Sequence, residues 1–253
     1  MKKILVINSK GGSGKTTVAT NLACQLAQAG KVTALCDDDP QASASTWLQV
    51  RPESLPQIHG VNPHQVNVTR STRCWQQRVP VDTSHYVIDS PAGIDLPKLY
   101  DLIRGVDLIL IPVLPSIIDI NATGGFVANL IKAGKLRVTP ARIGVIINRA
   151  RERTVALRKL EAFAASLDLP LLGKLRDSQS YIRAIDQGLG VCELKKGYRQ
   201  EHHAWQEIMR WVLDVPVSQT TAPPMVKSNP LTGTGGNAAA DSHLPLDKMS
   251  SLV

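Results

Sequence analysis

A short segment near the beginning of the chain has the composition of a phosphate-binding loop. Residues 9–17 read SKGGSGKTT, between an apolar run at Ile4–Ile7 and a helical pattern that begins at Thr16. Glycines let successive backbone N–H groups turn inward around an anion, and the following helix presents its positive dipole end. In this motif the lysine reaches the β- and γ-phosphates, and the hydroxyl after it ligates Mg²⁺. The spacing predicts nucleotide contacts from Gly11, Gly12, Ser13, Gly14, Lys15, Thr16 and Thr17, with Thr16 on the metal.

Carboxylates follow two further apolar runs. Val32–Cys36 leads into three consecutive aspartates, Asp37 to Asp39, and Tyr86–Ile88 leads into Asp89. Adjacent carboxylates repel one another, so a compensating positive charge is expected beside them. At the carboxyl ends of parallel strands they would face a ligand crevice. An aspartate that ends a strand also supplies a Mg²⁺ contact in P-loop NTPases. We therefore expect Mg²⁺ and a polarised water next to these groups.

The elements that must position these residues alternate along the chain. Nearly continuous apolar runs are typical of parallel strands covered on both faces. Such runs occur at Ile4–Ile7, Val32–Cys36, Tyr86–Ile88, Leu108–Val113 and Ile143–Ile147. Helical patterns occur at Thr16–Ala29, Ala122–Ala133, Thr154–Ser166 and Gln200–Leu213. This alternation predicts an α/β fold with a doubly wound, mostly parallel sheet and helices on both faces.

Composition changes abruptly near Pro216. Residues 216–253 contain five prolines, three glycines, nine Ser or Thr residues and no aromatic residue. Such a segment buries too little apolar surface to offset the entropy of ordering it. We expect one folded domain over residues 1–215 and a disordered tail over residues 216–253.

Positive charge is concentrated in one part of the chain. The formal net charge is +8, and residues 132–200 alone carry 15 Lys or Arg against 6 Asp or Glu. A basic excess of this size predicts a polyanionic partner, although a solvated basic face is the alternative. Only ten residues are aromatic, which argues against stacking of single-stranded bases and favours duplex DNA.

The remaining composition excludes other classes of site. The cysteines at 24, 36, 74 and 192 form no C-x-x-C pair, which argues against a zinc site or a disulfide framework. The longest apolar run, Leu108–Ile118, contains two prolines and is too short to span a bilayer. No signal peptide is evident, so we expect a cytoplasmic protein that does not insert into a membrane.

Five motifs together resemble the ParA/MinD family of deviant-Walker ATPases. In chain order they are KGGSGKTT, DDDPQAS, VIDSPAG, IPVLPSIIDINAT and IINR, spread over roughly residues 1–213. Ser9 departs from the strict P-loop pattern at a position where the family varies. The resemblance is greatest to ParA-type partition and positioning ATPases without an N-terminal DNA-binding domain. It implies a P-loop NTPase fold, hydrolysis of ATP with Mg²⁺, and a homodimer that forms when ATP binds.

The resemblance also implies roles for individual residues. Lys10 matches the signature lysine that reaches the phosphates of a partner subunit. Asp39 matches the aspartate that orients the attacking water, and Asp37 its neighbour near the metal. Asp89 matches the Walker B aspartate, and Asn148 matches an adenine-contacting asparagine.

Partners follow from the same resemblance. Family members of this type bind nonspecific double-stranded DNA, and an adaptor protein stimulates their ATPase activity. We therefore expect a nucleoid-associated ATPase that distributes a protein cargo such as a carboxysome. Asp119, in the segment PSIID, fits the family pattern without a role that we can assign to it. The candidate DNA contacts are Arg149, Arg151, Arg153, Arg158, Lys159, Arg176, Arg183, Lys195, Lys196 and Arg199.

Other interpretations stay open at this point. Plasmid or chromosome partition with a ParB-like protein is the main alternative. A MinD-like membrane ATPase would need a basic amphipathic helix at the C-terminus, whereas the final residues SHLPLDKMSSLV hold one lysine and a proline. An iron–sulfur reductase would need cysteines in other contexts. A nucleotide-gated binding module with little hydrolysis would not need Lys10 and Asp39.

Overall fold

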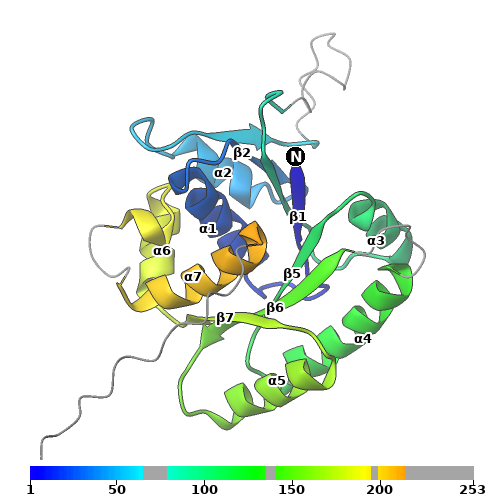
Figure 1. The fold of residues 1–253 in the computed structure, drawn as a ribbon. Helices are drawn as coiled ribbons and strands as arrows, with labels where there is room; N and C mark the ends of the chain where they lie inside the picture. Colours follow the sequence, from blue (N-terminus) through cyan, green and yellow to red (C-terminus); the bar gives the residue numbers. More distant parts are fainter. Residues whose placement is uncertain (65–78, 135–140, 195–198, 215–253) are drawn as a thin grey trace, which may run out of the picture. The chain divides into compact units, whose positions relative to one another are not determined.

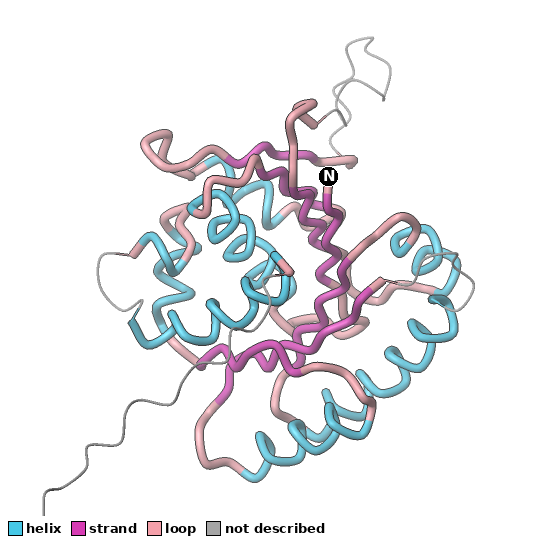
Figure 2. Tube along the Cα trace, in the orientation of Figure 1, coloured by secondary structure: helices cyan, strands magenta, loops and turns pink. Residues whose placement is uncertain are grey.

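A seven-stranded parallel sheet runs through the middle of the described part of residues 1–216 (Figures 1 and 2). The computed structural model describes residues 1–64, 79–134, 141–194 and 199–214. The strands are β1 (Lys2–Val6), β2 (Thr33–Asp37), β3 (Ile58–Val61), β4 (His85–Asp89), β5 (Leu108–Val113), β6 (Arg142–Ala150) and β7 (Leu171–Arg176). Their order across the sheet is β3-β2-β4-β1-β5-β6-β7. The predicted tail, residues 216–253, lies outside the described residues.

Helices cover both faces of this sheet, each over a separate apolar core (Figure 1). On one face lie α1 (Lys15–Gln28), α2 (Ser43–Gln49), α6 (Gln179–Asp186), the 3₁₀ helix η1 (Val191–Glu193) and α7 (Arg199–Leu213). On the other lie α3 (Leu96–Ile103), α4 (Ile117–Gly134) and α5 (Val155–Ser166). The predicted α/β architecture with a doubly wound, mostly parallel sheet is confirmed.

β1 holds the central place in the sheet and therefore fixes the segment that follows it. It pairs with β4 on one side and with β5 on the other. Val6 lies opposite Asp89 of β4 and opposite Leu110 of β5. Since all three strands run in the same direction, the loops after β1 and β4 leave the sheet side by side.

The sequence pattern missed two strands and the helices α3 and α6. β3 contains His59 and Gly60, which interrupt its apolar run, and β7 is an edge strand whose Lys174 is exposed. The missed helices have only 8 residues each, too few for a clear helical period. For α2 (Ser43–Gln49) the Ser/Thr-rich segment after Pro40 indicates a helix start but not its length. The helix predicted at Ala122–Ala133 begins earlier, at Ile117.

A buried ion pair joins the end of α2 to η1. The Arg51 guanidinium donates hydrogen bonds of 2.9 Å and 2.6 Å to the two carboxylate oxygens of Glu193. The side chains are only 6% and 0% exposed. Burial raises the pKa of Glu193, but hydrogen bonds from Arg51 and from the Gly190 N–H outweigh it, so its pKa lies below the ordinary value. The pair fastens helices that come from distant parts of the sequence.

We predict that Arg51→Ala lowers the free energy of unfolding by about 3 kcal/mol or more, because it leaves the Glu193 charge buried without a positively charged partner. The matched control is Arg151→Ala, which breaks the exposed pair with Asp177 and should cost about 1 kcal/mol or less. Urea denaturation monitored by tryptophan fluorescence measures both. Equal losses in the two variants would contradict the role given to the buried pair.

Candidate nucleotide site

The loop between β1 and α1 presents free backbone donors at a helix N-terminus. Gly12 and Gly14 have φ angles of 77° and 91°, which glycine adopts without strain. Gly14 precedes the first residue of α1, and no side chain caps this end of the helix. The first turn of α1 also contains no acidic residue. Its N–H groups are therefore available to an anionic ligand, as the sequence pattern predicts.

Asn148, at the carboxyl end of β6, holds this loop in place. Its Nδ2 donates a 2.9 Å hydrogen bond to the Ser13 carbonyl, and its Oδ1 accepts one of 3.0 Å from the Arg149 N–H. A Cβ atom on Gly14 would lie only 1.9 Å from Nδ2 of Asn148, so the close approach requires glycine. Asn148 was predicted to contact adenine; in this structure its side chain is buried against the loop.

The two lysines of the loop differ in their surroundings. Lys15 is buried, and its Nζ lies 3.3 Å from the Lys10 carbonyl oxygen. Burial lowers the pKa of the Lys15 ammonium, and the carboxylates of Asp89 and Asp39 act against that shift. The Lys10 ammonium instead lies 3.0 Å from Oδ1 of Asp119, in the first turn of α4. The sequence motifs assign no role to Asp119.

Two carboxylates lie side by side at the ends of β2 and β4. Asp37 and Asp89 occupy paired positions of these strands, and both are buried. The Asp37 oxygens accept hydrogen bonds from the N–H groups of Ser45, at 2.6 Å, and Asp39, at 3.4 Å. Neither oxygen of Asp89 has a hydrogen bond of good geometry among the described residues. Asp37 therefore orders the loop that follows β2, whereas the burial of Asp89 is only partly offset, by the Thr16 hydroxyl and Lys15.

Asp89 has the features of a group that faces a cation. Burial raises its pKa to about 7; the Thr16 hydroxyl and Lys15 oppose this rise, and Asp37 and Asp39 add to it. A buried carboxylate without a partner is costly unless an ion or water offsets it. Among the described residues no group of three or more His, Cys, Asp or Glu could hold a metal ion. One carboxylate with a threonine nonetheless suits Mg²⁺, which takes its other ligands from phosphates and water.

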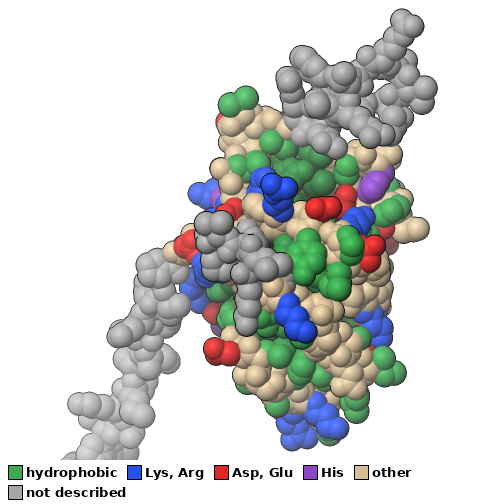
Figure 3. All heavy atoms as spheres, turned by 90° about the vertical axis from the view of Figure 1, so that its right-hand side faces the viewer, with side chains coloured by type: hydrophobic (Ala, Val, Ile, Leu, Met, Phe, Trp, Pro, Cys, Tyr) green, Lys and Arg blue, Asp and Glu red, His purple; other side chains and the backbone are tan. Residues whose placement is uncertain are grey.

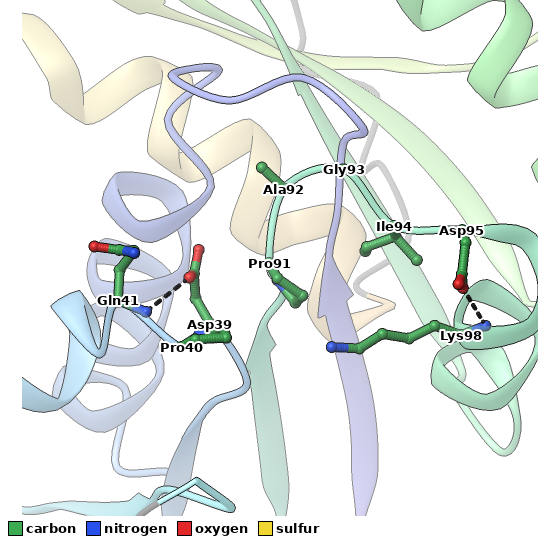
Figure 4. Close-up of a pocket in the computed structure, with 9 residues that line it drawn as sticks. All are labelled: Asp39, Pro40, Gln41, Pro91, Ala92, Gly93, Ile94, Asp95 and Lys98. Carbon is green, nitrogen blue, oxygen red and sulfur yellow. Dashed lines mark hydrogen bonds between the residues drawn. The ribbon is translucent and has the colours of Figure 1, made fainter.

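A pocket of about 450 Å³ opens where the loops after β2 and β4 face each other (Figure 4). Asp39 lines it from one side and Lys98 of α3 from the other (Figure 4). Asp39 Oδ1 accepts a 3.0 Å hydrogen bond from the Gln41 N–H. The Gly93 N–H donates to the Ser9 carbonyl at 2.9 Å, which fastens the pocket wall to the phosphate-binding loop. Lys98 lies on a helix that the sequence pattern did not predict.

The structure separates the predicted basic residues into two kinds. Arg151 is paired with Asp177, and Arg176 contacts Gln200 and Glu201. Six of the predicted DNA contacts are exposed and have no ion pair to any described residue. They are Arg149, Arg153, Arg158, Lys159, Arg183 and Arg199. Lys195 and Lys196 lie outside the described residues. In Figure 3, Lys and Arg side chains gather at the lower end of the face, at the height of α5 in Figure 1.

Comparison with known proteins agrees with this geometry. A family model described as the CobQ/CobB/MinD/ParA nucleotide binding domain matches residues 4–191. The chain belongs to this family. The family model is that of a nucleotide binding domain, and the five sequence motifs of this chain resemble those of its ParA/MinD members.

Named relatives show which members of the family this chain is similar to. Maintenance of carboxysome distribution protein A (McdA) from Halothiobacillus neapolitanus is 28% identical over 193 residues, which are 76% of this chain and 87% of that protein. A structure of a Cyanothece McdA variant in complex with ATP has a TM-score of 0.66 and 20% identity, covering 85% of this chain and 96% of that one. The cell division ATPase MinD from Pyrococcus furiosus gives 0.63 and 22%, covering 83% and 100%. The two structures share the fold with this chain.

Two further observations concern membrane spans and cysteines. Within the described ranges, none of the helices has the length and apolar content needed to cross a membrane. Cys24, Cys36 and Cys192 are free thiols, the first two buried, and Cys74 lies outside the described residues.

The raised pKa of Asp89 predicts a pH-dependent stability. Between its ordinary value of 3.8 and about 7, the folded protein keeps a proton that the unfolded chain has released, so stability falls as the pH rises. Asparagine does not titrate. Nucleotide-free Asp89→Asn should therefore melt about 5 °C above the wild type at pH 8, and the difference should narrow at pH 5.

The control for this prediction is Asp101→Asn, which alters an exposed carboxylate of α3. Differential scanning calorimetry at the two pH values measures all three proteins. A gain for Asp89→Asn that is the same at pH 5 and pH 8 would show that the Asp89 charge is not its cause.

Proposed function

We propose that this protein is a positioning ATPase. Its ATP-bound dimer binds DNA, and hydrolysis of ATP releases the protein from the DNA. The observation that carries the proposal is the buried and only partly compensated Asp89 carboxylate beside Lys15 and the open N-terminus of α1. A magnesium nucleotide supplies both the cation that Asp89 lacks and the anion that the helix end and Lys15 attract.

Each residue of the site then has a task. The backbone of residues 11–17 and Lys15 hold the phosphates, and Thr16 and Asp89 hold Mg²⁺, with Asp37 supporting the adjoining loop. When bound, Mg²⁺ neutralises charge on the β- and γ-phosphate oxygens. Asp39 accepts a hydrogen bond from water, whose oxygen attacks the γ-phosphorus. The bond from that phosphorus to the bridging oxygen breaks, and ADP, phosphate and a proton leave.

The proposed dimer places Lys10 of one copy on the phosphates of the other. A second lysine there adds positive charge where the transferred phosphoryl group carries negative charge. Apolar side chains remain exposed on the neighbouring helices, which supports contact with a second copy: Leu96, Tyr100, Ile117 and Ile118 are 48%, 40%, 55% and 73% exposed. Figure 3 shows hydrophobic side chains distributed over this face. An adaptor protein would stimulate hydrolysis.

The proposed DNA contacts come from the loop after β6, from α5 and α6, and from the start of α7. Arg153 is exposed with a positive φ of 61°, a conformation that non-glycine residues seldom adopt. Unpaired arginines such as Arg153 and Arg158 would contact phosphates without reading the base sequence. Binding of this kind would keep the ATP-bound protein on the nucleoid in the cytoplasm.

The cargo we propose is a protein assembly, with the carboxysome as its first candidate. Support comes from the likeness to carboxysome distribution protein A over 76% of this chain. Partition of a plasmid or chromosome through a ParB-like protein is the second candidate, because the same motifs occur in ParA-type partition ATPases. Stimulation of phosphate release by a carboxysome-associated adaptor or by a centromere-bound adaptor distinguishes the two.

We predict that Asp39→Ala retains ATP binding and ATP-dependent DNA binding but lowers DNA-stimulated phosphate release at least about tenfold, since no carboxylate then orients the water. Lys15→Ala is the comparison variant, because it should lose nucleotide affinity itself. Fluorescent-nucleotide titration and a phosphate-release assay separate the two effects. Normal turnover in Asp39→Ala would remove Asp39 from the mechanism.

We also predict that Arg153→Glu/Arg158→Glu weakens ATP-dependent DNA binding about tenfold or more and reduces the slope of log affinity against log salt by about two. The matched control, Lys31→Glu/Arg104→Glu, makes the same charge change at exposed residues. They precede the amino ends of β2 and β5, whereas Arg153 follows the carboxyl end of β6. Fluorescence anisotropy with a DNA duplex at two salt concentrations measures both. Equal weakening in the control would point to net charge rather than to a surface.

A further inference from the structure

Asp119 lies at the start of α4 and has two distinct contacts. The sequence motifs assign it no role. The Ser116 hydroxyl donates a hydrogen bond to Asp119 Oδ2, and the Asp119 N–H donates one of 3.1 Å to the Ser116 Oγ. The Ser116 Oγ thus caps the Asp119 N–H in the first turn of α4, and one carboxylate oxygen accepts from the Ser116 hydroxyl. A neutral oxygen acceptor at position 119 could accept that second hydrogen bond.

The second oxygen of Asp119 requires a different explanation. Oδ1 is buried without a hydrogen bond of good geometry, and its partner among the described residues is the Lys10 ammonium, 3.0 Å away. The Asp119 side chain is 9% exposed and that of Lys10 is 35% exposed. A carboxylate with so little access to water needs a nearby positive charge, and Lys10 supplies it.

The backbone of Lys10 is also held on both sides. Its N–H donates a 3.1 Å hydrogen bond to Oδ1 of the buried Asn8, and its carbonyl oxygen lies 3.3 Å from Lys15 Nζ. Asn8 in turn donates to the Pro112 carbonyl at the end of β5, at 2.8 Å. The backbone is thus fixed while the side chain points to α4, so a change of partner for Lys10 requires only a rotation of its side chain.

From this arrangement we propose that Asp119 is a positioning residue that holds Lys10 within its own subunit until ATP brings two copies together. The inference rests on the proposed dimer, in which Lys10 contacts the partner's phosphates. Lys10 has one ammonium, so pairing with Asp119 and contact across the dimer compete. The free energy of the Lys10–Asp119 pair is therefore subtracted from that of dimer formation, and it keeps subunits apart at low protein concentration.

The variant that tests this is Asp119→Asn, which keeps an acceptor for Ser116 and removes the charge that holds Lys10. Ser116→Ala is the matched control, because it removes the cap and leaves the ion pair. Two measurements apply. The first is the rate at which acetic anhydride modifies Lys10 in the nucleotide-free protein, followed by mass spectrometry. The second is the dimer dissociation constant with Mg²⁺ and a non-hydrolysable ATP analogue, from sedimentation equilibrium.

We expect Asp119→Asn to raise the modification rate of Lys10 and to tighten the dimer, each by about fivefold, the scale of a partly exposed ion pair. Ser116→Ala should match the wild type in both measurements. Unchanged modification and dimerisation in Asp119→Asn, a weaker dimer, or the same effects in Ser116→Ala would each overturn the inference. If no protein dimerises with the analogue, the wild type included, the proposed function itself fails, and the modification rates still report on the pair.

Discussion

The buried charge of Asp89 is the constraint around which the rest of the site is arranged. A carboxylate removed from water at the end of a central strand has a high electrostatic cost, and this one has no hydrogen bond of good geometry among the described residues. Its pKa of about 7 reflects that cost. The cost is offset when positive charge arrives, so the folded protein is built to favour a bound cation. Lys15 is close but is itself partly desolvated, and it lies nearer to the loop carbonyl of Lys10.

The fold brings these groups together through the direction and the order of the strands. β1, β2 and β4 are neighbours in the sheet, so the phosphate-binding loop, the three aspartates and Asp89 leave the same edge. The contacts that hold the loops are mostly between backbone and side chain: Asn148 to Ser13, Asp37 to Ser45, and Asn8 to Lys10. Separate apolar cores on the two faces of the sheet support this edge from both sides.

The sequence was most informative where a motif restricts the backbone as well as the side chains. The glycine loop, the acidic strand ends and the five buried strands could be predicted, because each has a clear pattern at short range. Contacts over long separations could not. The pairing of Lys10 with Asp119 and the packing of Asn148 against Gly14 depend on the order of strands, which local periodicity does not contain. Short helices such as α3, which supplies Lys98 to the pocket, give too little periodicity to detect.

The hydrogen bond from Asn148 to the Ser13 carbonyl has a consequence for biosynthesis. Since synthesis proceeds from the N-terminus, the phosphate-binding loop is made before β4 and β5, which flank β1 in the sheet, and before Asn148, which lies near the carboxyl end of β6. A nascent chain shorter than about 150 residues lacks Asn148, so its phosphate-binding loop is not yet held in place. A complete nucleotide site therefore requires that synthesis has passed β6.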